Sequence, residues 1–112
     1  MSTLLVTGGC GFIGSHFVAL ALQKGYRVIN VDALTYAAMR AFDPSNQYVF
    51  VQGKIQDEKG MDEVFQRYRP LHVLNFAAES HVDRSIHSPR PFIETNIEGT
   101  FVLLEAARKW RI

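Results

Sequence analysis

Three regularly spaced glycines follow the first apolar run of the chain, Leu4–Val6. Gly8, Gly11 and Gly14 fit G-x-x-G-x-x-G, and Gly9, Gly11 and Gly14 also fit G-x-G-x-x-G. We prefer the first pattern, because Gly8 lies directly at the end of the apolar run. In such a segment the glycines make a tight turn, let a pyrophosphate approach the backbone and let a helix pack on a strand. The pattern predicts a diphosphate bound by backbone N–H groups at the positive end of a helix dipole. A plain turn before a helix is the alternative.

An acidic residue follows at the distance that this chemistry requires. Asp32 ends the second apolar run, 18 residues beyond Gly14. A carboxylate in this place accepts hydrogen bonds from the ribose hydroxyls of adenosine, and its charge repels a 2′-phosphate. A solvated Asp at a strand end is the alternative. Together with the glycines, Asp32 favours NAD over NADP.

A second polar run begins after the fourth apolar run. Ala77 and Ala78 leave room for a flat ligand, and Glu79, Ser80 and His81 follow them. Ligands of open parallel sheets bind beyond the carboxyl ends of the strands, near the point where the strand order reverses. We therefore expect the residues from 79 to 81 to face a ligand. For Asp83 and Arg84, pairing with each other or with the following helix is an equal alternative.

Strand and helix patterns alternate along the chain and position these residues. Apolar runs bounded by turn residues predict strands at Thr3–Thr7, Arg27–Val31, Tyr48–Gln52 and His72–Phe76. They predict helices at Phe12–Lys24, from a cap at Asp57 to about Tyr68 (with Met61, Val64, Phe65 and Tyr68 on one face), and from Pro91 onward, with a short helical turn near Ala37–Ala41. The last helix places Phe92, Ile93, Ile97, Phe101, Leu104 and Ala107 on one apolar side. This alternation predicts an α/β fold, a Rossmann-type parallel sheet of order 3-2-1-4 with flanking helices.

Composition excludes several other classes of protein. The chain has 112 residues and a net charge of +1 without a basic run, which argues against nucleic acid or an anionic membrane as partner. No apolar stretch reaches the ~20 residues of a membrane span. Cys10 is the single cysteine, so no internal disulfide forms, and a reducing cytoplasm is expected. We interpret Cys10 as a small packing residue, not a nucleophile. No ligand spacing indicates a metal site.

Four segments resemble one known family. Thr7–His16, Val31–Ala37, Phe76–Ser85 and Phe92–Ala107 resemble the N-terminal part of nucleotide-sugar 4,6-dehydratases, lyases of the extended short-chain dehydrogenase/reductase family. The dTDP-glucose 4,6-dehydratases are the most similar group, and Ala77–Ser85 is the most specific match. The resemblance implies NAD as cofactor and, in the complete enzyme, conversion of dTDP-glucose to dTDP-4-keto-6-deoxyglucose.

The same resemblance implies roles for individual residues. Residues implied at the NAD pyrophosphate are Gly8, Gly11, Phe12, Ile13 and Gly14, and those at the adenosine ribose are Asp32, Ala33, Leu34 and Thr35. Ile55 would lie against adenine, while Phe76, Ala77, Ala78 and Ser80 would extend toward the nicotinamide, supported by Thr95. Ser80 would also border the nucleotide sugar. Lys54 departs from the family, which usually has an Asp at this position to bind the adenine amino group. An ammonium cannot accept that hydrogen bond.

The family's catalytic residues are not predicted in this chain. No Tyr has a Lys four residues later, so the Tyr-x-x-x-Lys pair of the family is missing. We expect residues 1–112 to form an NAD-binding half-domain, incomplete relative to the family domain and without a substrate domain or activity of its own. A stand-alone module that binds a nucleotide or a partner, and a segment of a related epimerase or decarboxylase, are the alternatives. We also expect a homo-oligomer, formed through the bare fourth strand or through the last helix, which in the family is half of a dimer bundle.

Overall fold

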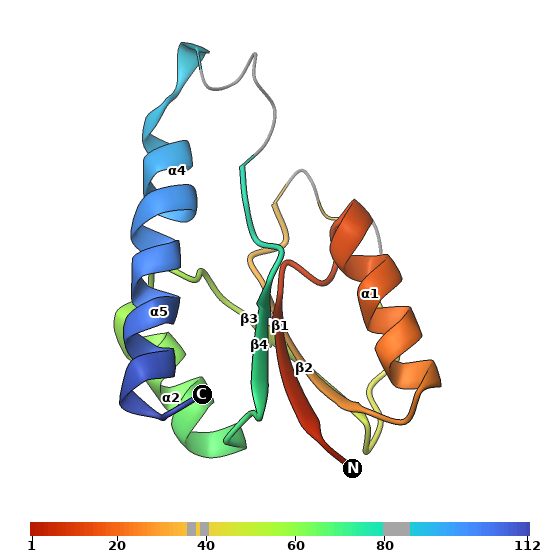
Figure 1. Ribbon diagram of the computed structural model, residues 1–112. Coiled ribbons are helices and arrows are strands. Elements are labelled where there is room, and N and C mark those ends of the chain that lie inside the picture. Colours follow the sequence, from red (N-terminus) through yellow and green to blue (C-terminus); the bar gives the residue numbers. More distant parts are fainter. Residues whose placement is uncertain (36–37, 39–40, 80–85) are drawn as a thin grey trace.

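One parallel sheet forms the centre of the molecule (Figure 1). The computed structural model describes residues 1–35, 38, 41–79 and 86–112. The strands are β1 (Thr3–Thr7), β2 (Arg27–Asp32), β3 (Tyr48–Gln52) and β4 (His72–Asn75), in the order β3-β2-β1-β4. In register, Leu5 of β1 lies between Ile29 of β2 and Val73 of β4. The predicted order 3-2-1-4 is confirmed.

Helices cover both faces of this sheet (Figure 1). The helix α1 (Phe12–Gln23) lies on one face, and α2 (Glu58–Tyr68) and α5 (Thr100–Lys109) lie on the other. The short helix α4 (Arg90–Phe92) and the π-helix η1 (Ile93–Gly99) precede α5 and extend past the carboxyl ends of the strands. This arrangement leaves the carboxyl edge of the sheet accessible beside η1.

Alternate side chains of the inner strands form two separate cores. The core under α2 and α5 contains Leu5, Ile29, Val31, Ile55, Met61, Val64, Phe65, Val102, Leu103 and Ala106. The core under α1 contains Leu4, Val6, Val18, Ala21, Val28 and Tyr48. Because side chains of a strand point to opposite faces in turn, continuous apolar runs supply both cores.

Most predicted boundaries agree with the structure within one residue. Asp57 caps α2 as predicted, since its carboxylate accepts a hydrogen bond from the N–H of Gly60. The first helix ends one residue early, and β2 extends by one residue to Asp32. Strand β4 ends at Asn75, not at Phe76, because the next N–H, that of Ala77, turns to the side chains of Thr7 and Asn75. The helical turn predicted near Ala37–Ala41 lies largely outside the described residues.

The last helix differs most from its prediction. A single helix from Pro91 was expected, whereas the structure has three consecutive segments with the π-helix η1 between two α-helices. A π-helix shifts the side-chain period, since each turn contains an additional residue. The predicted apolar side points outward: Ile93, Ile97, Phe101 and Leu104 are each at least half exposed, while Val102, Leu103 and Ala106 pack on the sheet.

Candidate functional site

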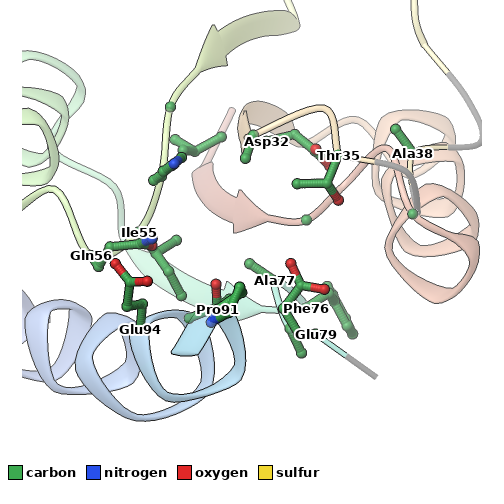
Figure 2. Close-up of a pocket in the computed structure, with 18 residues that line it drawn as sticks. Asp32, Thr35, Ala38, Ile55, Gln56, Phe76, Ala77, Glu79, Pro91 and Glu94 are labelled. Atoms are coloured by element: carbon green, nitrogen blue, oxygen red, sulfur yellow. The ribbon is translucent and has the colours of Figure 1, made fainter. Parts of the chain in front are cut away.

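A cleft lies beyond the carboxyl ends of the strands, between the glycine segment and η1. Figure 2 shows Asp32, Thr35 and Ala38 on one side of it and Pro91, Glu94, Phe76, Ala77 and Glu79 on the other. Its lining consists of Gly8, Gly11, Val31, Asp32, Ala33, Thr35, Ala38, Gly53, Lys54, Ile55, Gln56, Phe76, Ala77, Ala78, Glu79, Pro91, Glu94 and Thr95. Five segments that are distant in sequence therefore meet at one place.

Three close approaches shape the glycine segment. Gly8 has φ +69°, and a Cβ atom on it would lie 2.5 Å from the backbone nitrogen of Ala77. A Cβ atom on Gly14 would overlap the carbonyl oxygen of Gly8. A Cβ atom on Gly9 would overlap the side-chain amide of Asn30, so only glycine fits at all three positions. The N-cap residue of α1, Gly11, has no side chain to cap the first N–H groups of the helix, so these donors face the cleft end of α1.

The buried side-chain amide of Asn30 in β2 anchors the glycine segment to the sheet. Asn30 is fully buried in β2, and its Oδ1 accepts a hydrogen bond from the N–H of Gly9 at 2.9 Å. Its Nδ2 donates to the hydroxyl of Tyr48 at 3.0 Å and to Sγ of Cys10 at 3.4 Å. The sequence analysis missed Asn30, although a polar residue inside an apolar strand is a detectable signal. A buried amide with these partners fixes the height of the loop above the sheet.

The carboxylate of Asp32 connects the glycine segment with the loop after β2. It is 8% exposed, and its two oxygens accept hydrogen bonds from the N–H of Cys10 at 2.9 Å and of Leu34 at 2.7 Å. Each carboxylate oxygen has two acceptor sites. Asp32 can therefore accept further hydrogen bonds from a ligand while it keeps both backbone contacts.

Burial also determines the state of Cys10. Burial raises the pKa of its thiol, and the charge of Asp32 raises this pKa further. A helix N-terminus can lower a thiol pKa, but here that effect does not prevail. The pKa of the Tyr48 hydroxyl is raised as well, mainly by burial. Both groups are thus neutral packing residues at neutral pH, which agrees with the interpretation of Cys10 as a small packing residue.

Side-chain hydrogen bonds at two places fix the segment that follows β4. The hydroxyl of Thr7 donates to Oδ1 of Asn75 at 2.5 Å, and the N–H of Ala77 contacts the side-chain oxygens of both residues. Asn96 of η1 then binds the backbone of Glu79 twice, accepting from its N–H and donating to its carbonyl, each at 2.9 Å. The sequence analysis missed Asn96, since nothing in the local pattern connects it with Glu79.

The predicted site residues separate into three groups. Residues that line the cleft are Gly8, Gly11, Asp32, Ala33, Thr35, Ile55, Phe76, Ala77, Ala78 and Thr95. Phe12, Ile13, Gly14 and Leu34 do not line it: the side chains of Phe12, Ile13 and Leu34 are exposed, and Gly14 is buried under Gly8. Ser80 and His81, like Asp83 and Arg84, lie outside the described residues. Gly53, Gln56, Pro91 and Glu94 line the cleft without having been predicted.

The sheet order and the position of the cleft define an α/β protein of the Rossmann type. Residues 5–112 match the family model described as GDP-mannose 4,6 dehydratase, and the chain belongs to this family. A dTDP-glucose 4,6-dehydratase of Xanthomonas campestris pv. campestris is 50% identical over 114 residues, which cover 98% of this chain and 32% of the relative.

Solved structures with the same architecture include two sugar-nucleotide enzymes. The UDP-glucose 4-epimerase of Thermotoga maritima with UDP-glucose has a TM-score of 0.89 and 38% identity, over 98% of this chain and 35% of that one. The dTDP-glucose 4,6-dehydratase of Bacillus anthracis in complex with NAD has a TM-score of 0.83 and 38% identity, over 98% of this chain and 34% of that one. The chain thus spans about a third of the length of the relatives that it matches.

The described residues show neither a metal-binding cluster nor a membrane-spanning helix. In residues 1–35, 38, 41–79 and 86–112, no group of three or more His, Cys, Asp or Glu side chains could hold a metal ion. None of the helices in these same ranges has the length and apolar character needed to cross a bilayer.

Proposed function

We propose that this chain is the NAD-binding N-terminal segment of a nucleotide-sugar 4,6-dehydratase. In the complete enzyme, dTDP-glucose would be the substrate and dTDP-4-keto-6-deoxyglucose the product. The observation that carries the proposal is the convergence of the glycine segment, Asp32 and the segment Phe76–Glu79 on one cleft. The 50% identity with a dTDP-glucose 4,6-dehydratase supports the particular reaction.

The lining residues suggest where each part of NAD would lie. The pyrophosphate would lie against Gly8–Gly14 and the first turn of α1, where N–H groups and the helix dipole favour negative charge. The adenosine ribose would bind the remaining acceptor sites of Asp32, beside Ala33, Leu34 and Thr35, and the adenine would lie near Ile55. The nicotinamide would lie over Phe76, Ala77 and Ala78, with Thr95 beside it and Ser80 next to the sugar substrate.

This segment would position the cofactor and would not supply the acid and base groups. NAD supplies the hydride acceptor of the family reaction, and the residues of this chain bind and orient it. Glu79 and Glu94 line the cleft, yet the family's Tyr-x-x-x-Lys pair does not occur in the sequence. We therefore expect cofactor binding without turnover from these residues alone. A cytoplasmic location fits the single buried thiol of Cys10.

Self-association is a further part of the proposal. Strand β4 has its outer edge unpaired in the sheet, and an unpaired edge is a template for another strand. The exposed residues Ile93, Ile97, Phe101 and Leu104 form an apolar row along η1 and α5. A contiguous apolar surface of this kind marks an interaction site. Both features support a homo-oligomer, and light scattering of the purified chain over a concentration series would measure it.

Calorimetric titration with NAD and with NADP tests the proposed function. We expect NAD to bind at least about tenfold more tightly than NADP, because the charge of Asp32 repels a 2′-phosphate. Asp32→Asn removes this charge and should bring the two dissociation constants together, while Asp43→Ala, outside the cleft, should leave their ratio unchanged. An absence of NAD binding at millimolar concentration would overturn the proposal.

A further inference from the structure

One end of the cleft carries the ammonium group of Lys54. Lys54 lines the cleft in the segment that follows β3, and its side chain is exposed. In the described ranges of the chain the ion pairs are Arg108–Glu105 and Lys109–Asp62, and both lie outside the cleft. Glu94 of η1 lines the same cleft, and Figure 2 shows its carboxylate toward Ile55 and Gln56.

The order of the strands assigns this end to the base of the dinucleotide, provided that the proposed function holds. The glycine segment follows β1 and takes the pyrophosphate, and Asp32 at the end of β2 takes the adjacent ribose. The next strand outward is β3, and Gly53–Gln56 follow it directly. A base attached to that ribose therefore lies beside Lys54, Ile55 and Gln56.

The two charged groups differ in what they offer to a purine. A lysine ammonium has three donors and no acceptor, and a carboxylate only accepts. Adenine presents its N6 amino donor beside N7, so an ammonium that approaches N7 meets a second donor. A 6-oxopurine presents two adjacent acceptors, O6 and N7, which Lys and Arg recognise in guanine. Its N1–H is a donor that suits the carboxylate of Glu94. The N6 amino group of adenine would suit this carboxylate as well, so Lys54 is the group that distinguishes the two bases.

We propose that Lys54 is a base-specificity residue, which shifts the preference of this cleft toward dinucleotides with a 6-oxopurine base. The ligand class consists of nicotinamide dinucleotides with hypoxanthine or guanine in place of adenine. Lys54 donates to O6 and N7 of the base, Glu94 accepts from N1–H, and Ile55 supplies the apolar surface. NAD still binds, with its pyrophosphate and ribose contacts intact, but without a good partner for its N6 amino group at Lys54.

Titration of the full chain with NAD and with nicotinamide hypoxanthine dinucleotide tests this proposal. The readout is the ratio of the two dissociation constants, because it cancels general losses of binding. Lys54→Asp replaces the donor by an acceptor that suits the N6 amino group, so we expect the ratio to move roughly tenfold in favour of NAD, as one base contact allows. Lys59→Asp, the same charge change on α2 outside the cleft, should leave the ratio unchanged.

The possible results separate this inference from the proposed function. If both dinucleotides bind and Lys54→Asp leaves their ratio unchanged, the base-specificity role is wrong while the NAD site stands. If Lys54→Asp weakens NADP alone and the base ratio stays constant, the ammonium serves a phosphate, and the inference is wrong again. If neither dinucleotide binds to the unaltered chain, both proposals fail.

Discussion

Two halves of the molecule differ sharply in how completely they are packed. The closed half, which consists of β1 and β2 with α1 and α2, buries nearly every strand residue and pairs its buried polar groups. The open half consists of β4, η1 and the outer face of α5, where β4 is half-exposed and Ile93, Ile97, Phe101 and Leu104 face outward. The candidate cleft lies at the junction of these halves.

The two halves differ in how firmly they hold their parts of the cleft. The glycine segment and Asp32 are held by buried hydrogen bonds within the closed half, so their geometry does not depend on a partner. The segment Phe76–Glu79 is held by Thr7, Asn75 and Asn96, and most of these contacts are partly or fully exposed. We therefore expect the pyrophosphate and ribose end of the cleft to be more rigid than the end next to η1.

Substitution of one phenylalanine in each half should produce the largest contrast. Phe65 is fully buried and Phe101 is 62% exposed. Phe65→Ala should lower the free energy of unfolding by about 4 kcal/mol, because it leaves a cavity in the core. Phe101→Ala should lower it by less than about 0.5 kcal/mol in the monomer. Urea unfolding followed by circular dichroism measures both values, and equal losses would show that the open half is covered in solution.

Two glycines with positive φ allow the strain of a side chain to be separated from its overlap with neighbours. Gly8 has φ +69° and lies against Ala77, whereas Gly25 has φ +89° with no atom near its missing Cβ. Gly25→Ala should cost about 1 kcal/mol from backbone strain alone. Gly8→Ala should cost about 3 kcal/mol, because overpacking adds to the same strain. Thermal unfolding of the two variants compares them, and similar midpoints would contradict the close approach at Gly8.

The asparagines of the two halves should also differ. Asn30→Ala removes the partners of the Gly9 N–H and the Tyr48 hydroxyl, and leaving buried groups unpaired should cost about 2 kcal/mol. Asn96→Ala removes two exposed contacts to Glu79 and should cost less than about 1 kcal/mol, since water can replace them. Chemical denaturation of both variants tests this order. A larger loss for Asn96 would reverse the assignment of the closed and open halves.

The smallest predicted effect is a pH dependence at the contact between α2 of the closed half and the C-terminal end of α5. Hydrogen bonds from Lys109, and then from the indole of Trp110, lower the pKa of Asp62 below its usual 3.8. A carboxyl group with a lowered pKa in the folded state stabilises the fold above its unfolded pKa, and this contribution is lost as the pH falls through the folded pKa. Asp62→Asn should therefore lower the melting temperature slightly at pH 6 and not at pH 2. An equal difference at both pH values would contradict the prediction.

Local features of the sequence determined the elements and much of the cleft. Continuous apolar runs, the Asp57 cap and the spacing of Gly8, Gly11 and Gly14 act over a few residues. They therefore predict strands, helix starts and the glycine turn without knowledge of the remaining chain. The same local signals placed Asp32 and Ala77 at carboxyl ends of strands, and the structure brings both to the cleft.

Only the tertiary structure decided which groups meet across long separations. The sequence contains Asn30, Asn96, Lys54 and Glu94 without any pattern that connects them, because their contacts depend on how the strands are ordered and where η1 packs. The exposed apolar row of Ile93, Ile97, Phe101 and Leu104 on the last helix also depends on tertiary contacts that local periodicity does not predict. Periodicity predicted one apolar side, but two faces of this helix are apolar, and the one that buries Val102, Leu103 and Ala106 was selected by contact with β1, β2 and α2.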